Sequence, residues 1–269
     1  MTPVSPIRTP QSLLLCILLA AASPAVAAPG IGLAWNQCFG EAGAVQNAAF
    51  ACDTNTGSHR LEASFELSSP MSIVIGVEMV FDLASASPTL PSWWQLFYAG
   101  SCRPTSLAAD FLPDPGDVQC TDWSVGLSAG GLGGYCTAAN ATPVGCGLPG
   151  QPLNTARIKG ITAVASQFAQ DLAGLHPYFA FGIRINHEKT VGDGACGGCT
   201  VPVCIVFNSI NVVARNNVEN RYLTAPQAPG ANFVTWQGGG APVVGTAIGC
   251  PAATAVRRSS WGEMKSLYR

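Results

Sequence analysis

Residues 73–83 read IVIGVEMVFDL, and their alternation is the strongest fold signal in the chain. One face of an extended chain would carry only apolar side chains here, and the other would carry Gly76, Glu78 and Asp82. Successive side chains of a strand point to opposite faces, so this period of two predicts a β-strand with one buried face. The apolar face comprises Ile73, Ile75, Val77, Met79, Phe81 and Leu83.

The same alternation recurs on both sides of this stretch. Upstream, residues 60–67 place Glu62 and Glu66 on one face and apolar side chains on the other, which predicts a strand whose polar face meets solvent. Clusters of Gly, Pro, Asn or Asp bound each candidate, as expected for strands joined by turns. The remaining candidate strands are residues 158–164, 178–186, 203–213 and 233–236.

Helical signals are weak by comparison. Residues 163–172 fit either a short helix or a strand with a bulge. Strand and helix patterns do not alternate and no internal repeat is visible, which disfavours a parallel α/β sheet, a propeller and a solenoid. We therefore predict an all-β fold, an antiparallel β-sandwich of jelly-roll or immunoglobulin-like type, with residues 113–116 and 126–150 in long disulfide-stapled loops.

Composition narrows the class of partner. Charged residues make up 10% of the chain, against about a quarter in a typical protein, and apolar residues make up 48%. The formal net charge is -2, from 13 Lys and Arg against 15 Asp and Glu. These values exclude a coiled coil or a charged disordered chain, and they leave no electrostatic footprint for nucleic acid or an anionic membrane.

The N-terminal residues have the layout of an export signal. Arg8 precedes an apolar run over residues 13–22, Pro24 breaks the run, and Ala25-Val26-Ala27 forms a small-x-small cleavage site. The run is too short to span a bilayer, which needs about 20 residues. We expect a signal peptide over residues 1–27 cleaved near Ala27, a sandwich domain over 28–237, a Gly/Pro/Ala-rich linker over 238–258 and a short tail over 259–269.

Cleavage would remove Cys16 and leave an even number of cysteines, which in an exported chain predicts disulfides. Proximity in the sequence favours Cys38–Cys52, Cys102–Cys120 and Cys136–Cys146, and leaves the last four to pair among themselves. The expected disulfide cysteines are Cys38, Cys52, Cys102, Cys120, Cys136, Cys146, Cys196, Cys199, Cys204 and Cys250.

One catalytic motif and one cofactor-binding motif match the sequence pattern, but neither is followed by the helix that the motif requires. Residues 126–130 fit the nucleophile elbow G-x-S-x-G around Ser128, with Asp171 and either His176 or His187 following in the chain. The glycines after it cannot form the helix that this motif requires. Residues 192–197 fit G-x-G-x-x-G but open a cysteine cluster instead of a helix, so dinucleotide binding is excluded.

The sequence also offers candidate metal sites, each with a competing interpretation. Cys196, Cys199 and Cys204 with Cys250 could hold zinc through thiolates, but their spacing is not a standard one and export favours disulfides. An EF-hand is excluded after Asp53, because its Gly and Glu positions are not met. A Ca²⁺ site stays open in an acidic loop, where solvated surface acids are the alternative. The loop carries Asp110, Asp114, Asp117 and Asp122.

The aromatic residues suggest a different kind of site. Neighbouring side chains of a strand face opposite ways, so one of Trp93 and Trp94 should enter the core and the other could be exposed. An exposed ring stacks on the apolar face of a sugar, whereas two buried rings would only fill the sandwich. The ligand-binding candidates are Trp93, Trp94, Tyr98 and Trp123.

Paired carboxylates and histidines complete the list of candidates. Glycoside hydrolysis needs two carboxyl groups that converge, and Glu62, Glu66, Glu78 and Glu188 could supply them, although Glu62 and Glu66 are expected on a solvent face. The three histidines are far apart in sequence and fit no catalytic spacing, so we expect them at strand ends. They are His59, His176 and His187.

Several segments resemble a group of exported bacterial proteins of uncharacterised activity. The tail W-G-E-M-K-S-L-Y-R over residues 261–269 is similar to their W-G-x-x-K-S-L-Y-R ending. The resemblance implies bacterial export, and it transfers no functional residue. The tail itself is either a sorting segment or a short helix docked on the domain. The other similar segments are residues 93–95, 102–103, 199–211 and 235–238.

Two functions follow from these patterns. The first is an exported surface or extracellular structural or adhesion module without catalytic activity, with a polysaccharide or a surface protein as its partner. The alternative is a secreted hydrolase of envelope or extracellular polymers that uses a carboxylate pair or Ser128. An enzyme needs a concave pocket with converging titratable groups, whereas a binding module needs exposed aromatic residues.

Overall fold

The computed structural model of the chain describes residues 28–138 and 152–237. The predicted signal peptide, Cys146, Cys250, and the predicted linker and tail over residues 238–269 lie outside the described residues. Within the two described ranges the elements are strands and two short 3₁₀ turns, which confirms the predicted all-β class. No helix in this part of the chain has the length and apolarity needed to cross a bilayer.

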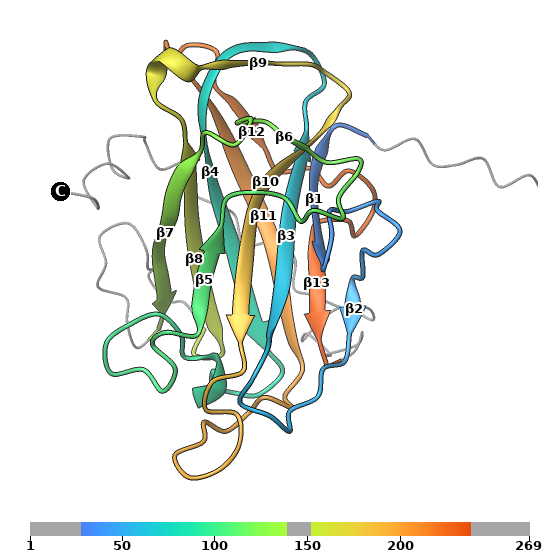
Figure 1. Ribbon diagram of the computed structural model, residues 1–269. Helices are drawn as coiled ribbons and strands as arrows, with labels where there is room; N and C mark the ends of the chain where they lie inside the picture. Colours follow the sequence, from blue (N-terminus) through green and yellow to red (C-terminus); the bar gives the residue numbers. More distant parts are fainter. Residues whose placement is uncertain (1–27, 139–151, 238–269) are drawn as a thin grey trace, which may run out of the picture.

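Two sheets pack face to face as a sandwich (Figure 1). The first sheet has the strand order β1-β3-β10-β5, with the short β6 paired to β10. Its neighbours are antiparallel except β6 and β10. The strands are β1 (Gly30–Trp35), β3 (Ser58–Glu66), β5 (Leu107–Asp110), β6 (Thr121–Asp122) and β10 (Pro177–Asn186).

The second sheet has the order β2-β13-β11-β4-β8-β7, with β12 paired to β11 and β9 paired to β4. All of its pairs are antiparallel except β2 and β13. Its strands are β2 (Asn47–Ala48), β4 (Met71–Ser85), β7 (Ala129–Thr137), β8 (Thr155–Ala163), β9 (Gln170–Leu172), β11 (Val203–Ala214), β12 (Arg221–Leu223) and β13 (Phe233–Trp236).

The predicted strands all form, and their apolar faces meet between the sheets. Phe65 of β3 and Phe181 of β10 face Phe81 of β4 and Phe207 of β11 in one buried cluster. One insert was misread: residues 129–137, predicted to lie in a loop, form strand β7 at the edge of the second sheet. Its glycines conceal the period of two because they contribute no side chain to either face.

Strand β4, which carries the deciding stretch, contains a bulge. Its pairing with β11 skips one residue, because Val213 lies opposite Gly76 and Ala214 lies opposite Val74. An extra residue moves the following side chains to the other face. Val74 is therefore fully buried while Ile73 and Ile75 are only partly buried, and the prediction that these two isoleucines share the face of Val77 is wrong.

The ambiguous stretch 163–172 combines a turn with a strand. The 3₁₀ turn η2 (Ser166–Phe168) follows β8, and β9 then pairs with the start of β4. The other 3₁₀ turn, η1 (Ser92–Trp94), contains both tryptophans of the Trp pair. Neither turn is long enough to count as a helical layer.

The disulfides join segments that are far apart in sequence. Cys38 bonds Cys120, Cys52 bonds Cys199, and Cys102 bonds Cys196, over separations of 82, 147 and 94 residues. The predictions Cys38–Cys52 and Cys102–Cys120 are therefore wrong, as is pairing of the last four cysteines among themselves. Strands that are adjacent in a sandwich come from distant parts of the chain, so loops that share one end of the fold are remote in sequence. Cys136 and Cys204 are also disulfide-bonded.

These bridges indicate an oxidising compartment, because exposed thiols are kept reduced in the cytosol. They also restrict the unfolded chain, more strongly for longer loops.

Replacing Cys52 and Cys199 together by alanine should lower the free energy of unfolding by about 4 kcal/mol, because their bridge closes the longest of the described loops. Urea unfolding of the oxidised wild type and of the double variant measures this difference. Peptide mapping without reductant should recover the three described bridges. Recovery of Cys38 linked to Cys52 would contradict the structure.

Candidate functional site

The outer face of the first sheet carries a layer of loops. The sequence predicts that the polar side of β3 meets solvent, yet Glu62 and Ser64 are fully buried and Glu66 is 6% exposed. The cover consists of segments 36–46 and 111–120, and Figure 1 shows the chain leading into β6 crossing in front of β3 and β10. The prediction of a solvent face is wrong because period two reports polarity and cannot show that a loop folds over a strand.

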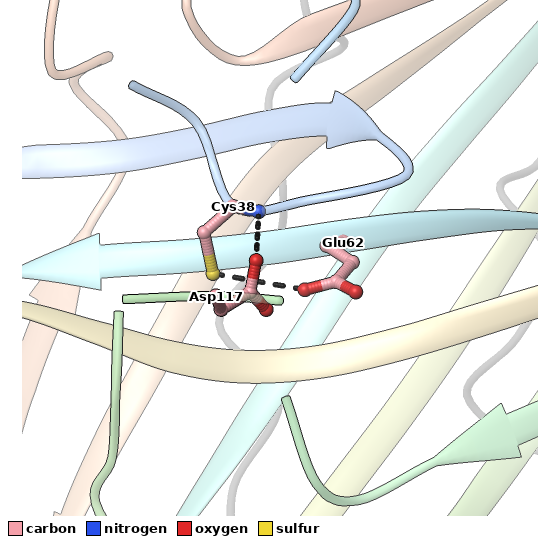
Figure 2. Close-up of side chains that lie close together, drawn as sticks. All are labelled: Cys38, Glu62 and Asp117. Carbon is pink, nitrogen blue, oxygen red and sulfur yellow. Dashed lines mark hydrogen bonds between the residues drawn. The ribbon is translucent and has the colours of Figure 1, made fainter. Parts of the chain in front are cut away.

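The bridge Cys38–Cys120 joins these two covering segments above Glu62. The Cys38 sulfur lies 3.7 Å from Glu62 Oε2, and the Cys38 amide donates to Asp117 Oδ1 at 3.1 Å (Figure 2). Glu41 also joins the two covering segments, since its Oε1 accepts a hydrogen bond from the amide of Val118 at 2.9 Å. The carboxylates therefore fix the path of the loops by accepting backbone hydrogen bonds.

Cys38, Glu62 and Asp117 have the spacing of a metal site but not its chemistry. One ligand atom from each lies within 4.8 Å of the others. A cysteine binds metal as a thiolate, and the Cys38 sulfur is committed to its bond with Cys120. Two carboxylates remain, and Arg60 Nε already lies 2.6 Å from Glu62 Oε1. We therefore interpret this cluster as structural.

Glu62 holds a proton at neutral pH. Burial, a hydrogen bond with Asp117 and the nearby acidic groups together raise the pKa of its carboxyl group to about 9, although Arg60 opposes the shift. Burial away from water and a neighbouring acidic group both disfavour the charged form of a carboxyl group. Unfolding exposes Glu62 to water and returns its pKa to its ordinary value of 4.5, at which the proton is released.

The acidic loop that was a Ca²⁺ candidate binds the protein's own donors. Asp110 lies 2.9 Å from Arg184 and 3.5 Å from Arg60. Asp114 accepts from its own turn, Asp117 accepts from Cys38, and Asp122 accepts from the amide and hydroxyl of Ser124. In the described chain these four carboxylates do not gather in any group of three that could hold a metal ion.

The carboxylate and serine candidates for hydrolysis do not converge either. Glu78 lies on the outer face of the second sheet and accepts from Asn211, whereas Glu188 binds Thr105 at the far end of β10. Ser128 donates to the Phe111 carbonyl at 3.2 Å, and Asp171 accepts from the Ile73 amide. The strand β7 follows Ser128 where the nucleophile elbow requires a helix.

The Trp pair is a core element. Trp93 and Trp94 are both fully buried, and Trp123 is 3% exposed, so of the two alternatives the structure has the one in which both rings fill the sandwich. The pair lies in η1, where consecutive side chains do not alternate between two faces. Both rings pack against Trp236, with centroid distances of 5.0 and 5.3 Å. Among the four aromatic candidates, only Tyr98 is partly exposed.

Arg103, which the sequence did not single out, binds this aromatic cluster. Its guanidinium lies 3.6 Å from the centre of the Trp93 ring and donates to the carbonyls of Trp93, Glu188 and Asn186. Burial lowers the pKa of Arg103 to about 10, so the group is still cationic at neutral pH. No sequence signal distinguishes an arginine that will be buried from one on the surface.

The histidines lie at strand ends, as predicted, and two of them meet. The rings of His59 and His187 are 4.6 Å apart, and His59 also lies against Phe50 at 3.7 Å. Burial lowers the pKa of both, that of His59 to about 4, and Arg103 further disfavours the charged form of His187. His176 instead contacts Thr121, with 2.7 Å between Nε2 and the hydroxyl oxygen.

The proposed zinc cluster does not exist as thiolates. Cys196 and Cys199 bond Cys102 and Cys52, and Cys204 is also disulfide-bonded.

A search with protein-family models found none that matches this chain, and searches of curated proteins and of solved structures found no similar protein. The site must therefore be interpreted from its own geometry.

Glu62→Gln should flatten the pH dependence of stability. A carboxyl group with a raised pKa stabilises the fold below its unfolded pKa of 4.5, and this contribution is lost as pH rises toward about 9. Relative to Glu62→Gln, the wild type should lose about 1.4 kcal/mol of unfolding free energy per pH unit in that window. Urea unfolding from pH 5 to 9 measures it, with the exposed Glu219→Gln as control. Parallel profiles for wild type and Glu62→Gln would refute the buried proton.

The pair His59 and His187 should change the pH dependence of stability in the direction opposite to Glu62. Its lowered pKa values mean that the unfolded chain binds protons first as pH falls below 6.5, so stability should fall between about pH 6.5 and pH 4. His59→Phe keeps a ring against Phe50 and should lose less stability between pH 7 and pH 5 than the wild type, as judged by urea midpoints. His176→Gln should behave as the wild type. An equal loss in His59→Phe would contradict this assignment.

Proposed function

We propose that this chain is exported and acts at the cell surface or outside the cell as a structural or adhesion module without catalytic activity. The observation that carries the proposal is the set of long-range disulfides, which tie loops to the sandwich at separations of 82 to 147 residues. Such bridges form and persist in oxidising compartments and stabilise domains that stay exposed outside the cell.

The fate of the polar candidates supports a role that is not catalytic. Glu62, Asp122, Ser128 and Asp171 each bind a partner within the fold, and the Glu candidates lie on different faces. A hydrolase would need some of these groups to converge on an open pocket. The described geometry therefore favours the module over the alternative of a secreted hydrolase.

Two features of the sequence support the same proposal. The leader-like residues 1–27 would direct export with cleavage near Ala27. The tail over residues 261–269 is similar to the ending of uncharacterised exported bacterial proteins, and would then serve as a sorting or docking segment. The partner of the folded module would be a polysaccharide or a surface protein.

Fractionation of cells that produce the full chain tests this function. We expect the protein outside the cytoplasm, lacking residues 1–27 by intact-mass analysis, and with its cysteines unreactive toward a thiol reagent until reductant is added. Removal of residues 2–27 should retain it in the cytoplasm as the matched control. A full-length, thiol-reactive protein in the cytoplasm of the producing cells would refute the proposal.

A further inference from the structure

A pocket of about 210 Å³ opens beside η1, at the end of the sandwich where β7 finishes. Each residue of its wall belongs to the described chain, and none of them carries a charge. The wall combines one aromatic ring, hydroxyl and amide side chains, and two leucines. The residues that matter here are Tyr98, Gln95, Thr89, Thr137, Leu90 and Leu153.

This combination suits a neutral sugar. A sugar ring presents an apolar face of C–H groups that stacks on an aromatic side chain, and a rim of hydroxyl groups that bind amides and hydroxyls. Tyr98 offers the ring, and Thr89 and Gln95 offer the polar groups. The Gln95 Nε2 already donates to the Leu90 carbonyl at 3.2 Å, which fixes the direction of its amide. An acidic sugar would instead require a cation in the wall, and none is present among these residues.

The size of the pocket limits the ligand to one ring. Sites for drug-sized molecules have volumes of roughly 300–1,000 Å³. The volume here, about 210 Å³, is smaller. It would accommodate a terminal or branching sugar unit, with the rest of the chain outside.

The loop that carries Tyr98 is held in place before any ligand arrives. The Ser101 amide donates to the Tyr98 carbonyl at 3.0 Å, and Cys102 is bonded to Cys196. Arg103, next along the chain, is anchored on Trp93. Rigid binding groups lose less conformational entropy when a ligand binds, so this support favours affinity.

The residue before Tyr98 has an uncommon backbone conformation. Phe97 has φ 65°, in the left-handed region that disfavours residues other than Gly, and its ring is 39% exposed. Strain of this kind concentrates at binding sites. Here it turns the chain between buried Leu96 and the wall residue Tyr98.

We infer that this pocket binds a single neutral sugar unit of an extracellular polysaccharide, with Tyr98 as the stacking platform. The inference rests on the proposed function, since it names the partner of the surface module. It replaces the tryptophan pair, which is buried, by the one aromatic candidate that a ligand can reach.

Affinity electrophoresis of the full oxidised chain tests the pocket. The gels contain neutral polymers (xylan, dextran, galactomannan, mixed-linkage glucan) or acidic polymers (alginate, pectate). We expect retardation by at least one neutral polymer, and relief by a free neutral monosaccharide taken from that polymer. Tyr98→Ala should weaken binding at least tenfold, whereas Tyr98→Phe should keep most of it. Phe168→Ala is the matched control, because Phe168 is an exposed aromatic residue at the opposite end of the sandwich.

The outcomes separate the two proposals. Retardation that Tyr98→Ala leaves unchanged, retardation by acidic polymers alone, or none by any polymer would overturn the sugar pocket. Urea unfolding of Tyr98→Ala shows whether lost binding reflects lost folding, and Tyr98→Phe carries the test if it does. None of these results affects the export test. A cytoplasmic, reduced chain would overturn the proposed function even if purified protein bound sugar.

Discussion

The stacking of the Arg103 guanidinium on Trp93 organises one whole end of this molecule. A buried cation is tolerable only when its donors are satisfied, and the carbonyls of Trp93, Asn186 and Glu188 satisfy those of Arg103. These carbonyls belong to η1 and to the chain that leaves β10, so one side chain ties two loops together. The adjacent bridge Cys102–Cys196 links the loop that carries Arg103 covalently to the chain that follows β10. Burial lowers the pKa of the neighbouring His187, and the charge of Arg103 lowers it further.

The outer face of the first sheet solves a similar problem with opposite charges. There, Glu62 lies under loops that the bridge Cys38–Cys120 closes, and Asp117 belongs to one of these loops. The raised pKa keeps the Glu62 carboxyl group protonated, and Arg60 Nε lies 2.6 Å from it. The two sites thus depend on pH in opposite senses, since histidine protonation weakens one and carboxyl ionisation weakens the other. Their pH ranges overlap below pH 6.5, where the two contributions partly cancel.

Much of the fold could be predicted from the sequence, because period two is a local property. Residues 73–83 and 178–186 show their strands without any knowledge of the partners. The strand β7 could not be found in this way, since its glycines provide no alternation. The bulge in β4 was equally hidden, because it depends on which residue of β11 lies opposite.

The candidate site was less predictable, because it depends on contacts between distant segments. The burial of Glu62 depends on segments 36–46 and 111–120 folding over β3, and no pattern within residues 60–67 reports this. The sequence left the tryptophan pair open between an exposed platform and a buried pair, because it does not reveal that η1 forms where a strand was assumed. The bridges followed spatial rather than sequence proximity, so the pairs chosen by spacing at Cys38 and Cys102 failed. Tyr98 became a candidate because it lies close in sequence to the tryptophan pair, and only the structure places it in a pocket wall.

The separations of the disulfide partners also constrain how the chain reaches its native state. A chain that enters an oxidising compartment from its N-terminus exposes Cys38 and Cys52 well before Cys120 and Cys199. Where these two early cysteines bond each other first, that loop must be opened before either native bridge can form. This route to the native state needs thiol–disulfide exchange after most of the chain has arrived, and an isomerase accelerates such a step more than an oxidant does.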